Sequence, residues 1–370
     1  MSDPTVAPGP VCPPSSRIPK DVASTLPDVT RPHDPPAPRR YTAPAGLAGD
    51  TGGVAAQLRG MLRAGDLDLP RPGAGHTARR WAALAGWGSR DLSLARLAEG
   101  HVDALAILAE AGCAPASGAL YGVWASRSGG AAVRVERRGS SRVLAGTMRF
   151  CSGARVLDRA LVVADPPGEA PSDRRLLLDV DVTVAGVEAL ADTWCTAAMA
   201  AADTLDVVFD DVQVTDDAPV GEPGWYVDRP GFVLGGAGVA AVWWGGANGV
   251  LERVLRHLRP SPDAHQLAHV GELHAALAAT DALLRQTAAV VDADPAGDHG
   301  LAVATVRAAV ERAAREVVDR APRIVGPAPL SRDADLARAL ADLTLYVRQH
   351  HAERDHAALG GQVVDRWRTA

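Results

Sequence analysis

Residues 133–150 read VRVERRGSSRVLAGTMRF, and this stretch decides the fold class of the chain. Val133 and Val135 alternate with charged residues, and Gly139-Ser140 then turns the chain toward a second apolar run. A two-residue alternation indicates strands with one buried face. Short apolar runs separated by Gly, Asp and Ser recur after it: Leu161 to Val163, Leu176 to Val184, and Leu205 to Val214. The pattern predicts a region of antiparallel strands.

On the N-terminal side of these strands the apolar residues have helical spacing. Between Thr77 and Gly112 they are Trp81, Leu84, Leu94, Leu97, Val102, Leu105 and Leu108. Asp91 is a candidate N-cap, and Gly112 is a candidate helix stop. Residues 1–45 are rich in Pro, Ser, Thr and Asp and hold few large apolar side chains. Such a segment buries too little surface to offset its ordering entropy, so we expect a disordered tail.

Four apolar stripes with helical spacing follow the strands. They are Val250, Val254 and Leu258; Val270, Leu273, Leu277, Leu284 and Val291; Val303, Val306, Val310 and Val317; and Leu336, Leu340, Leu343 and Val347. Prolines fall between the stripes: Pro260 and Pro262, Pro295, and Pro327 with Pro329. Because a proline ends or kinks a helix, the stripes predict four separate helices that pack as an antiparallel bundle.

The sequence therefore predicts an α+β chain that is mostly helical. We expect a disordered tail over residues 1–45, an N-terminal helical domain over 46–118, a middle antiparallel β-domain over 119–228 and a C-terminal four-helix bundle over 229–370. With 370 residues, of which 47% are hydrophobic, the chain can bury a full-sized core.

Charge and cysteine content exclude several classes of function. The net charge is −6, and the 38 Lys and Arg residues are scattered among acidic residues, so we expect no nucleic-acid binding. The four cysteines form no CxxC pair, which fits a reducing compartment and gives no zinc motif. No apolar run is long enough for a membrane span or a secretory signal. We expect a soluble cytoplasmic protein.

The order of helices, strands and helices resembles that of the acyl-CoA dehydrogenase family, over roughly residues 75–360. Four stretches carry the resemblance. Residues 91–96 with His101 resemble the family's N-terminal-domain helix, and residues 121–130 stand where the family has a Tyr-x-x-Thr-Glu…Gly-Ser-Asp loop. Residues 146–154, Gly-Thr-Met-Arg-Phe-Cys-Ser-Gly-Ala, resemble the segment that faces the flavin. Residues 207–214 resemble the Val-x-Phe-x-Asp-Val-x-Val strand.

The resemblance implies an FAD cofactor and a set of residues around it. Ser152 stands where the family has a threonine hydroxyl near flavin N5, and Phe150 replaces an aromatic wall residue. Trp124 occupies the threonine position of the first loop, where Gly129 and Gly130 would let the backbone approach the ligand. Arg323 precedes the prolines that replace a glycine-rich pyrophosphate turn, and it would serve there as a charged donor. Ordinary strand core, loop and interface packing are the alternative roles for these residues.

The resemblance also aligns His350 with the glutamate that acts as the family's catalytic base. An imidazole titrates near neutrality, so His350 can accept a proton, or donate one during oxygen chemistry at a flavin. The competing interpretation is that His350 and His351 only cap a helix end. His351 and Asp355 are four residues apart and could chelate a metal, but two ligands make a weak site, so we expect none.

Three functions remain open from the sequence. The first is an FAD-dependent oxidoreductase that desaturates an acyl-CoA or similar acyl thioester at the α,β position, with an electron-transfer flavoprotein as acceptor and a homo-oligomer as the assembly. The second is a flavin-dependent monooxygenase on the same fold, acting on another small molecule, with His350 as acid or base. The third is a non-catalytic relative that has lost the glutamate and the flavin.

Overall fold

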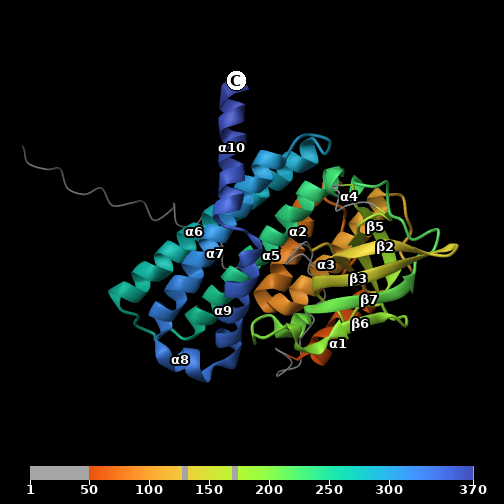
Figure 1. Cartoon of the computed structure of the whole chain (residues 1–370). Coiled ribbons are helices and arrows are strands. Elements are labelled where there is room, and N and C mark those ends of the chain that lie inside the picture. The colour runs from red at the N-terminus through yellow and green to blue at the C-terminus, as the bar shows by residue number, and fades with distance from the viewer. Residues whose placement is uncertain (1–49, 127–131, 169–173, 370) are drawn as a thin grey trace, which may run out of the picture.

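The computed structural model describes residues 50–126, 132–168 and 174–369. The predicted tail over residues 1–45 lies outside these ranges. The described elements follow the predicted order of helices, a β-region and a helical bundle, with the sheets and the bundle on opposite sides of α5 (Figure 1).

Three helices form the N-terminal part: α1 (Thr51–Ala64), α2 (Thr77–Arg90) and α3 (Leu92–Glu110). Asp91 separates the last two, and its Oδ1 accepts a hydrogen bond of 2.9 Å from the backbone N–H of Leu94. This satisfies one of the unpaired donors at the start of α3. Gly112 lies just beyond α3 with φ of 74°, a left-handed conformation that favours glycine. The N-cap and stop predicted from the sequence are therefore confirmed.

The middle region contains two small sheets. The first has the order β2 (Val133–Arg138), β3 (Ser141–Cys151), β7 (Leu205–Gln213), β6 (Val187–Leu190), and all its neighbours are antiparallel. The second has the order β1 (Tyr121–Trp124), β4 (Arg159–Ala164), β5 (Leu176–Asp181). In the second sheet β4 and β5 are antiparallel, but β1 runs parallel to β4. The predicted antiparallel strands are confirmed. The parallel pair was not predicted, because β1 is too short to show a two-residue period.

The C-terminal helices are α4 (Trp225–Asp228), α5 (Pro230–Arg256), α6 (Ala264–Ala293), α7 (Gly300–Val325), α8 (Pro327–Arg332), α9 (Ala334–Tyr346) and α10 (Glu353–Thr369). Helices α5, α6, α7 and α9 carry the four predicted stripes. The predicted gap at Pro327 and Pro329 is itself the short helix α8. Helix α10 extends past the end of the bundle (Figure 1). No helix among the described residues is both long and apolar enough to cross a membrane.

Helices α2 and α5 approach each other closely because glycines line their contact. A Cβ on Gly245 would lie 2.0 Å from the carbonyl oxygen of Ala85, and one on Gly249 would lie 2.3 Å from that of Ser89. Next to these glycines Trp243 and Trp244 are buried. Small residues therefore set the helix spacing, and the two indoles fill the core beside it.

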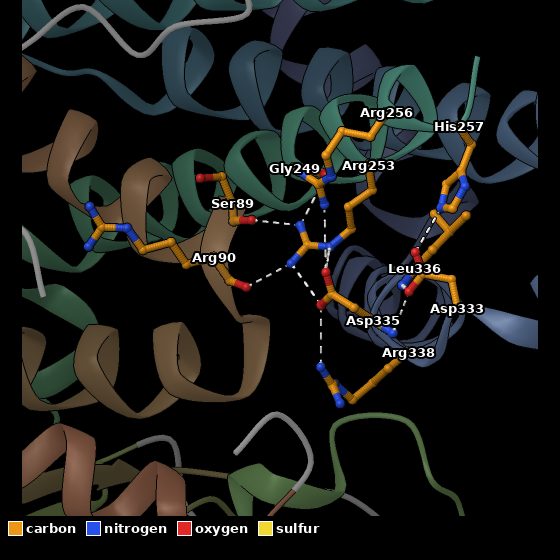
Figure 2. A network of polar contacts seen from close by, with 10 residues as sticks. All are labelled: Ser89, Arg90, Gly249, Arg253, Arg256, His257, Asp333, Asp335, Leu336 and Arg338. Atoms are coloured by element: carbon orange, nitrogen blue, oxygen red, sulfur yellow. Dashed lines mark hydrogen bonds and ion pairs between the residues drawn. The ribbon is translucent and has the colours of Figure 1, made fainter. Parts of the chain in front are cut away.

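One buried arginine ties three helices together (Figure 2). Arg253 on α5 donates to the carbonyl oxygens of Ser89 (2.9 Å) and Arg90 (3.0 Å) at the end of α2, and to both carboxylate oxygens of Asp335 on α9 (2.8 and 3.1 Å). The guanidinium satisfies carbonyls that a helix C-terminus leaves unpaired and places a positive charge at its negative end.

Candidate functional site

A cavity of about 650 Å³ lies where the N-terminal helices, the strands and the bundle meet. Its volume falls in the range of small-molecule sites, which is roughly 300–1,000 Å³. The walls come from α3, β1, β3, α4, α5, α7 and α10. Its apolar side includes Val123, Phe150, Phe232, Val239 and Val303, and its polar side includes Arg96, Glu99, Asp103, Arg229, Arg307 and His350.

Phe150 lines this cavity in an unusual conformation. Its φ is 59°, in the left-handed region that aromatic residues rarely adopt, and its side chain is 52% exposed. The strain coincides with an irregularity in the pairing of β3 with β7 between Met148 and Cys151. Bulges of this kind re-aim a side chain, and backbone strain clusters at functional sites. The strand ends by presenting an aromatic ring to the cavity.

Trp124 and Ser152 lie behind this wall and are both buried. The indole Nε1 of Trp124 donates to the carbonyl oxygen of Ser152 (3.0 Å), and the ring packs edge-on against Phe209. The hydroxyl of Ser152 pairs with the hydroxyl of Thr204 at 3.0 Å. Neither Trp124 nor Ser152 is among the residues that line the cavity. In this structure the two residues brace the end of β3, from which Phe150 projects.

His350 lies on the cavity wall in the segment between α9 and α10. Helix α9 ends at Tyr346, a 3-10 turn covers Val347–Gln349, and His350 itself is extended with ψ of 121°. The imidazole is buried, with Nδ1 unpartnered, and packs edge-on against Trp243 at 6.5 Å. Burial lowers the pKa of His350 below its ordinary value, while Asp355 and Glu311 partly offset this effect. The neutral ring is therefore favoured at neutral pH.

Charged side chains also line the cavity. Arg96 donates to Glu99 at 2.7 Å, and Arg229 donates to Glu110 at 2.7 Å. Burial raises the pKa of the Glu99 carboxyl, although Arg96 opposes that effect. Arg307 donates to the carbonyl of Gly236 at 2.6 Å and stacks over the ring of Trp243. The polar wall is thus built from paired charges of both signs.

Three other residues predicted for cofactor binding stand apart from this cavity or outside the described chain. Gly129 and Gly130 lie outside the described residues. Arg323 is at the end of α7, is 57% exposed and donates to Asp319 at 2.7 Å. It does not line the cavity. The structure brings Phe150 and His350 to one cavity, and it places Trp124 and Ser152 behind Phe150.

Glu311 is buried on α7 near His350 and was not predicted from the sequence. The signal was present: Arg307 and Glu311 follow Val303 at four-residue steps and so interrupt the buried face of this helix. His356 on α10 was not predicted either, and its ring centroid lies 5.0 Å from that of His350. Only the path of the chain between α9 and α10 brings His356 back onto His350.

Comparison with known proteins agrees with this architecture. Residues 222–347 match the model of the acyl-CoA dehydrogenase C-terminal domain. A search of curated proteins found no match.

Several solved structures are similar to this chain. FMN-bound TdsC, the dibenzothiophene monooxygenase of Paenibacillus sp. A11-2, is 20% identical with a TM-score of 0.69, covering 85% of this chain and 96% of that one. The methanesulfinate monooxygenase MsuC of Pseudomonas fluorescens is 17% identical with a TM-score of 0.70, over 85% and 96%. Butyryl-CoA dehydrogenase of Megasphaera elsdenii is 14% identical with a TM-score of 0.70, over 85% and 90%.

The resemblance seen in the sequence is therefore confirmed at the level of the fold. The chain has the acyl-CoA dehydrogenase fold, and its residues 222–347 match the model of the acyl-CoA dehydrogenase C-terminal domain.

Proposed function

We propose that this protein is a flavin-dependent oxidoreductase, and that it acts as a monooxygenase on a small organic substrate held in the cavity. The observation that carries the proposal is the presence of two features in one cavity lining. A strained, half-exposed aromatic side chain, Phe150, and a buried imidazole, His350, line the same space.

The residues of the cavity fit an isoalloxazine ring. Phe150 offers an aromatic face, and Val123 and Val239 offer apolar contacts. A bound flavin would supply the redox chemistry, by passing electrons to oxygen or taking a hydride from the substrate.

The flavin proposed is FMN rather than the FAD expected from the sequence. Pro327 and Pro329 have no N–H group, and the segment that would carry a pyrophosphate turn is instead the short helix α8. Arg323, expected to bind the pyrophosphate, is paired with Asp319. A neighbour of this fold, TdsC, was solved with FMN.

His350 would transfer the proton, whether the flavin passes electrons to oxygen or takes a hydride from the substrate. Its buried imidazole can accept a proton from a substrate or give one to a departing oxygen, and Trp243 holds the ring from one side. Two ion pairs at the cavity, Arg96 with Glu99 and Arg229 with Glu110, would orient a polar group of the substrate. Because each pair is neutral overall, the pairs do not favour a substrate with a large net charge.

A second candidate is the α,β-desaturation of an acyl thioester with an electron-transfer flavoprotein as acceptor. The match of residues 222–347 to the acyl-CoA dehydrogenase C-terminal domain favours it. The position expected for the glutamate base carries His350, which can also remove a proton. By the same resemblance we expect a homo-oligomer, which light scattering would measure.

Flavin binding and reactivity separate these candidates. The purified full chain is titrated with FMN and with FAD, and the quenching of flavin fluorescence gives each affinity. We expect FMN to bind more tightly. If the protein binds neither flavin, both enzymatic functions are contradicted, and a non-catalytic relative is the function that remains.

The reduced holoprotein is then mixed with oxygen and a panel of substrates that includes indole and dibenzothiophene, the compounds named for TdsC. An oxygenated product supports the monooxygenase. Anaerobic bleaching of the flavin by an acyl-CoA supports the dehydrogenase instead. Replacing His350 by Gln should lower turnover by about 10²-fold or more with flavin affinity kept, whereas the exposed neighbour change His351→Gln should leave turnover unchanged.

A further inference from the structure

Three side chains that can bind a metal meet beside the cavity. One ligand atom from each of Glu311, His350 and His356 lies within 4.8 Å of the other two. They come from α7, the segment between α9 and α10, and α10 itself. Glu311 and His350 are buried, and His356 is exposed.

Two of the three offer atoms with unmet bonding capacity. The Oε2 atom of Glu311 and the Nδ1 atom of His350 are both shielded from solvent and have no hydrogen-bond partner within the described part of the chain. Burying an unpaired carboxylate oxygen is costly. Both atoms belong to residues that are more than nine-tenths buried and that offer ligand atoms within 4.8 Å of each other. These two unpaired atoms indicate a ligand other than the flavin and substrate of the proposed function, and a metal ion bound to His350 would exclude its role in proton transfer while it is bound.

We propose that Glu311, His350 and His356 form a binding site for a divalent transition-metal ion such as Zn²⁺. Two imidazoles and one carboxylate are the ligands that Zn²⁺ and Fe²⁺ prefer, and three protein ligands leave a fourth position open. Because His350 lines the cavity, water or a small anion from the cavity can occupy that position.

The arrangement needs only a small adjustment to close around an ion. Ligand atoms around a tetrahedral zinc ion lie about 3.3 Å apart, since each metal bond is about 2.0–2.1 Å. The exposed side chain of His356 can rotate to close the remaining distance.

The charges around the site leave Oε2 of Glu311 without a partner among the described residues. Arg315 and Arg348 both approach Oε1 of Glu311, at 2.7 and 3.4 Å, and each is about half exposed. Water screens their repulsion of an incoming cation. Their contacts orient the carboxylate as outer partners of a metal ligand do. Near His350, Asp355 adds a negative charge and Arg307 adds a positive one.

Zinc binding to the full chain tests the proposal without any flavin. Tag-free protein is stripped with a chelator and titrated with Zn²⁺ by calorimetry in competition with a chelating dye. The background from exposed Cys195 is measured by repeating the titration on the Cys195→Ser variant. Mg²⁺ is the negative control, because it prefers oxygen ligands.

We expect one high-affinity zinc ion per chain, bound at least about tenfold more weakly by His356→Gln and by Glu311→Gln. His356 is exposed, so its variant should fold even if the Glu311 variant does not. The matched control His274→Gln, an exposed histidine on α6, should bind zinc as the parent does.

Two outcomes would overturn the site. One is zinc affinity that is unchanged in His356→Gln. The other is affinity that falls as much in His351→Gln as in His356→Gln, since His351 and Asp355 form an alternative pair with 3.6 Å between them. Zinc binding by a chain that takes up no flavin would leave this proposal standing and remove only the redox function.

Discussion

The indole of Trp124 donates its N–H to the carbonyl oxygen of Ser152 across 3.0 Å, and so fastens β1 to the end of β3. The bond is buried, and it lies directly behind the strained residue Phe150. This contact holds the wall of the proposed flavin site in place from outside the cavity.

Replacing Trp124 by Phe should lower the free energy of unfolding beyond the loss of ring volume. The carbonyl of Ser152 would be left without its donor, at a cost of about 1–3 kcal/mol. Trp81→Phe is the matched control, because the Nε1 atom of Trp81 is also buried but has no partner in the described structure. Urea denaturation compares the two variants. Equal destabilisation would show that the Trp124 bond contributes nothing.

Replacing Phe150 by Gly should separate binding from stability. Glycine adopts a φ of 59° without strain, so the fold should change in stability by no more than about 1 kcal/mol. Loss of the aromatic face should weaken flavin affinity by roughly tenfold, which is about 1.4 kcal/mol. Fluorescence titration with FMN measures the affinity. Unchanged FMN binding would place the flavin away from Phe150.

Arg253 is predicted to be a major structural arginine. Arg253→Met leaves the carbonyls of Ser89 and Arg90 and the carboxylate of Asp335 without their donor, so we expect a loss of about 3 kcal/mol or more. Arg256→Met is the control. Arg256 is exposed and lies 3.7 Å from Asp335, and its loss should cost less than about 0.5 kcal/mol. Thermal and urea unfolding would measure both.

His101 should make the fold sensitive to mild acid. Its Nδ1 accepts the N–H of Tyr121 at 3.1 Å, and burial lowers its pKa to about 4. An unfolded chain binds this proton near pH 6.5, so between these values the unfolded state holds more protons and stability falls as the pH falls.

Asparagine at position 101 can still accept the bond from Tyr121 but does not titrate. Between about pH 7 and about pH 5 the parent should therefore lose about 2 kcal/mol more unfolding free energy than His101→Asn. Parallel slopes for the two proteins would contradict the assignment of this acid sensitivity to His101.

The sequence was sufficient for the elements with a clear period or a local cap. The stripes of α5, α6, α7 and α9 needed only their own spacing, because each helix buries one face. The cap at Asp91 and the stop at Gly112 depend on bonds within a few residues. The parallel pairing of β1 with β4 was not predictable in this way, since it joins residues far apart in the chain.

The amino-acid sequence by itself determined the order of elements and the kind of fold, because periodicity and capping act within a helix or strand. Tertiary structure alone decided which predicted residues share a cavity: Phe150 and His350 line it, Trp124 and Ser152 stand behind it, and Arg323 lies outside. It also brought Glu311 and His356 to His350. These contacts depend on how whole helices pack and on the turn between α9 and α10, and no local pattern encodes that packing.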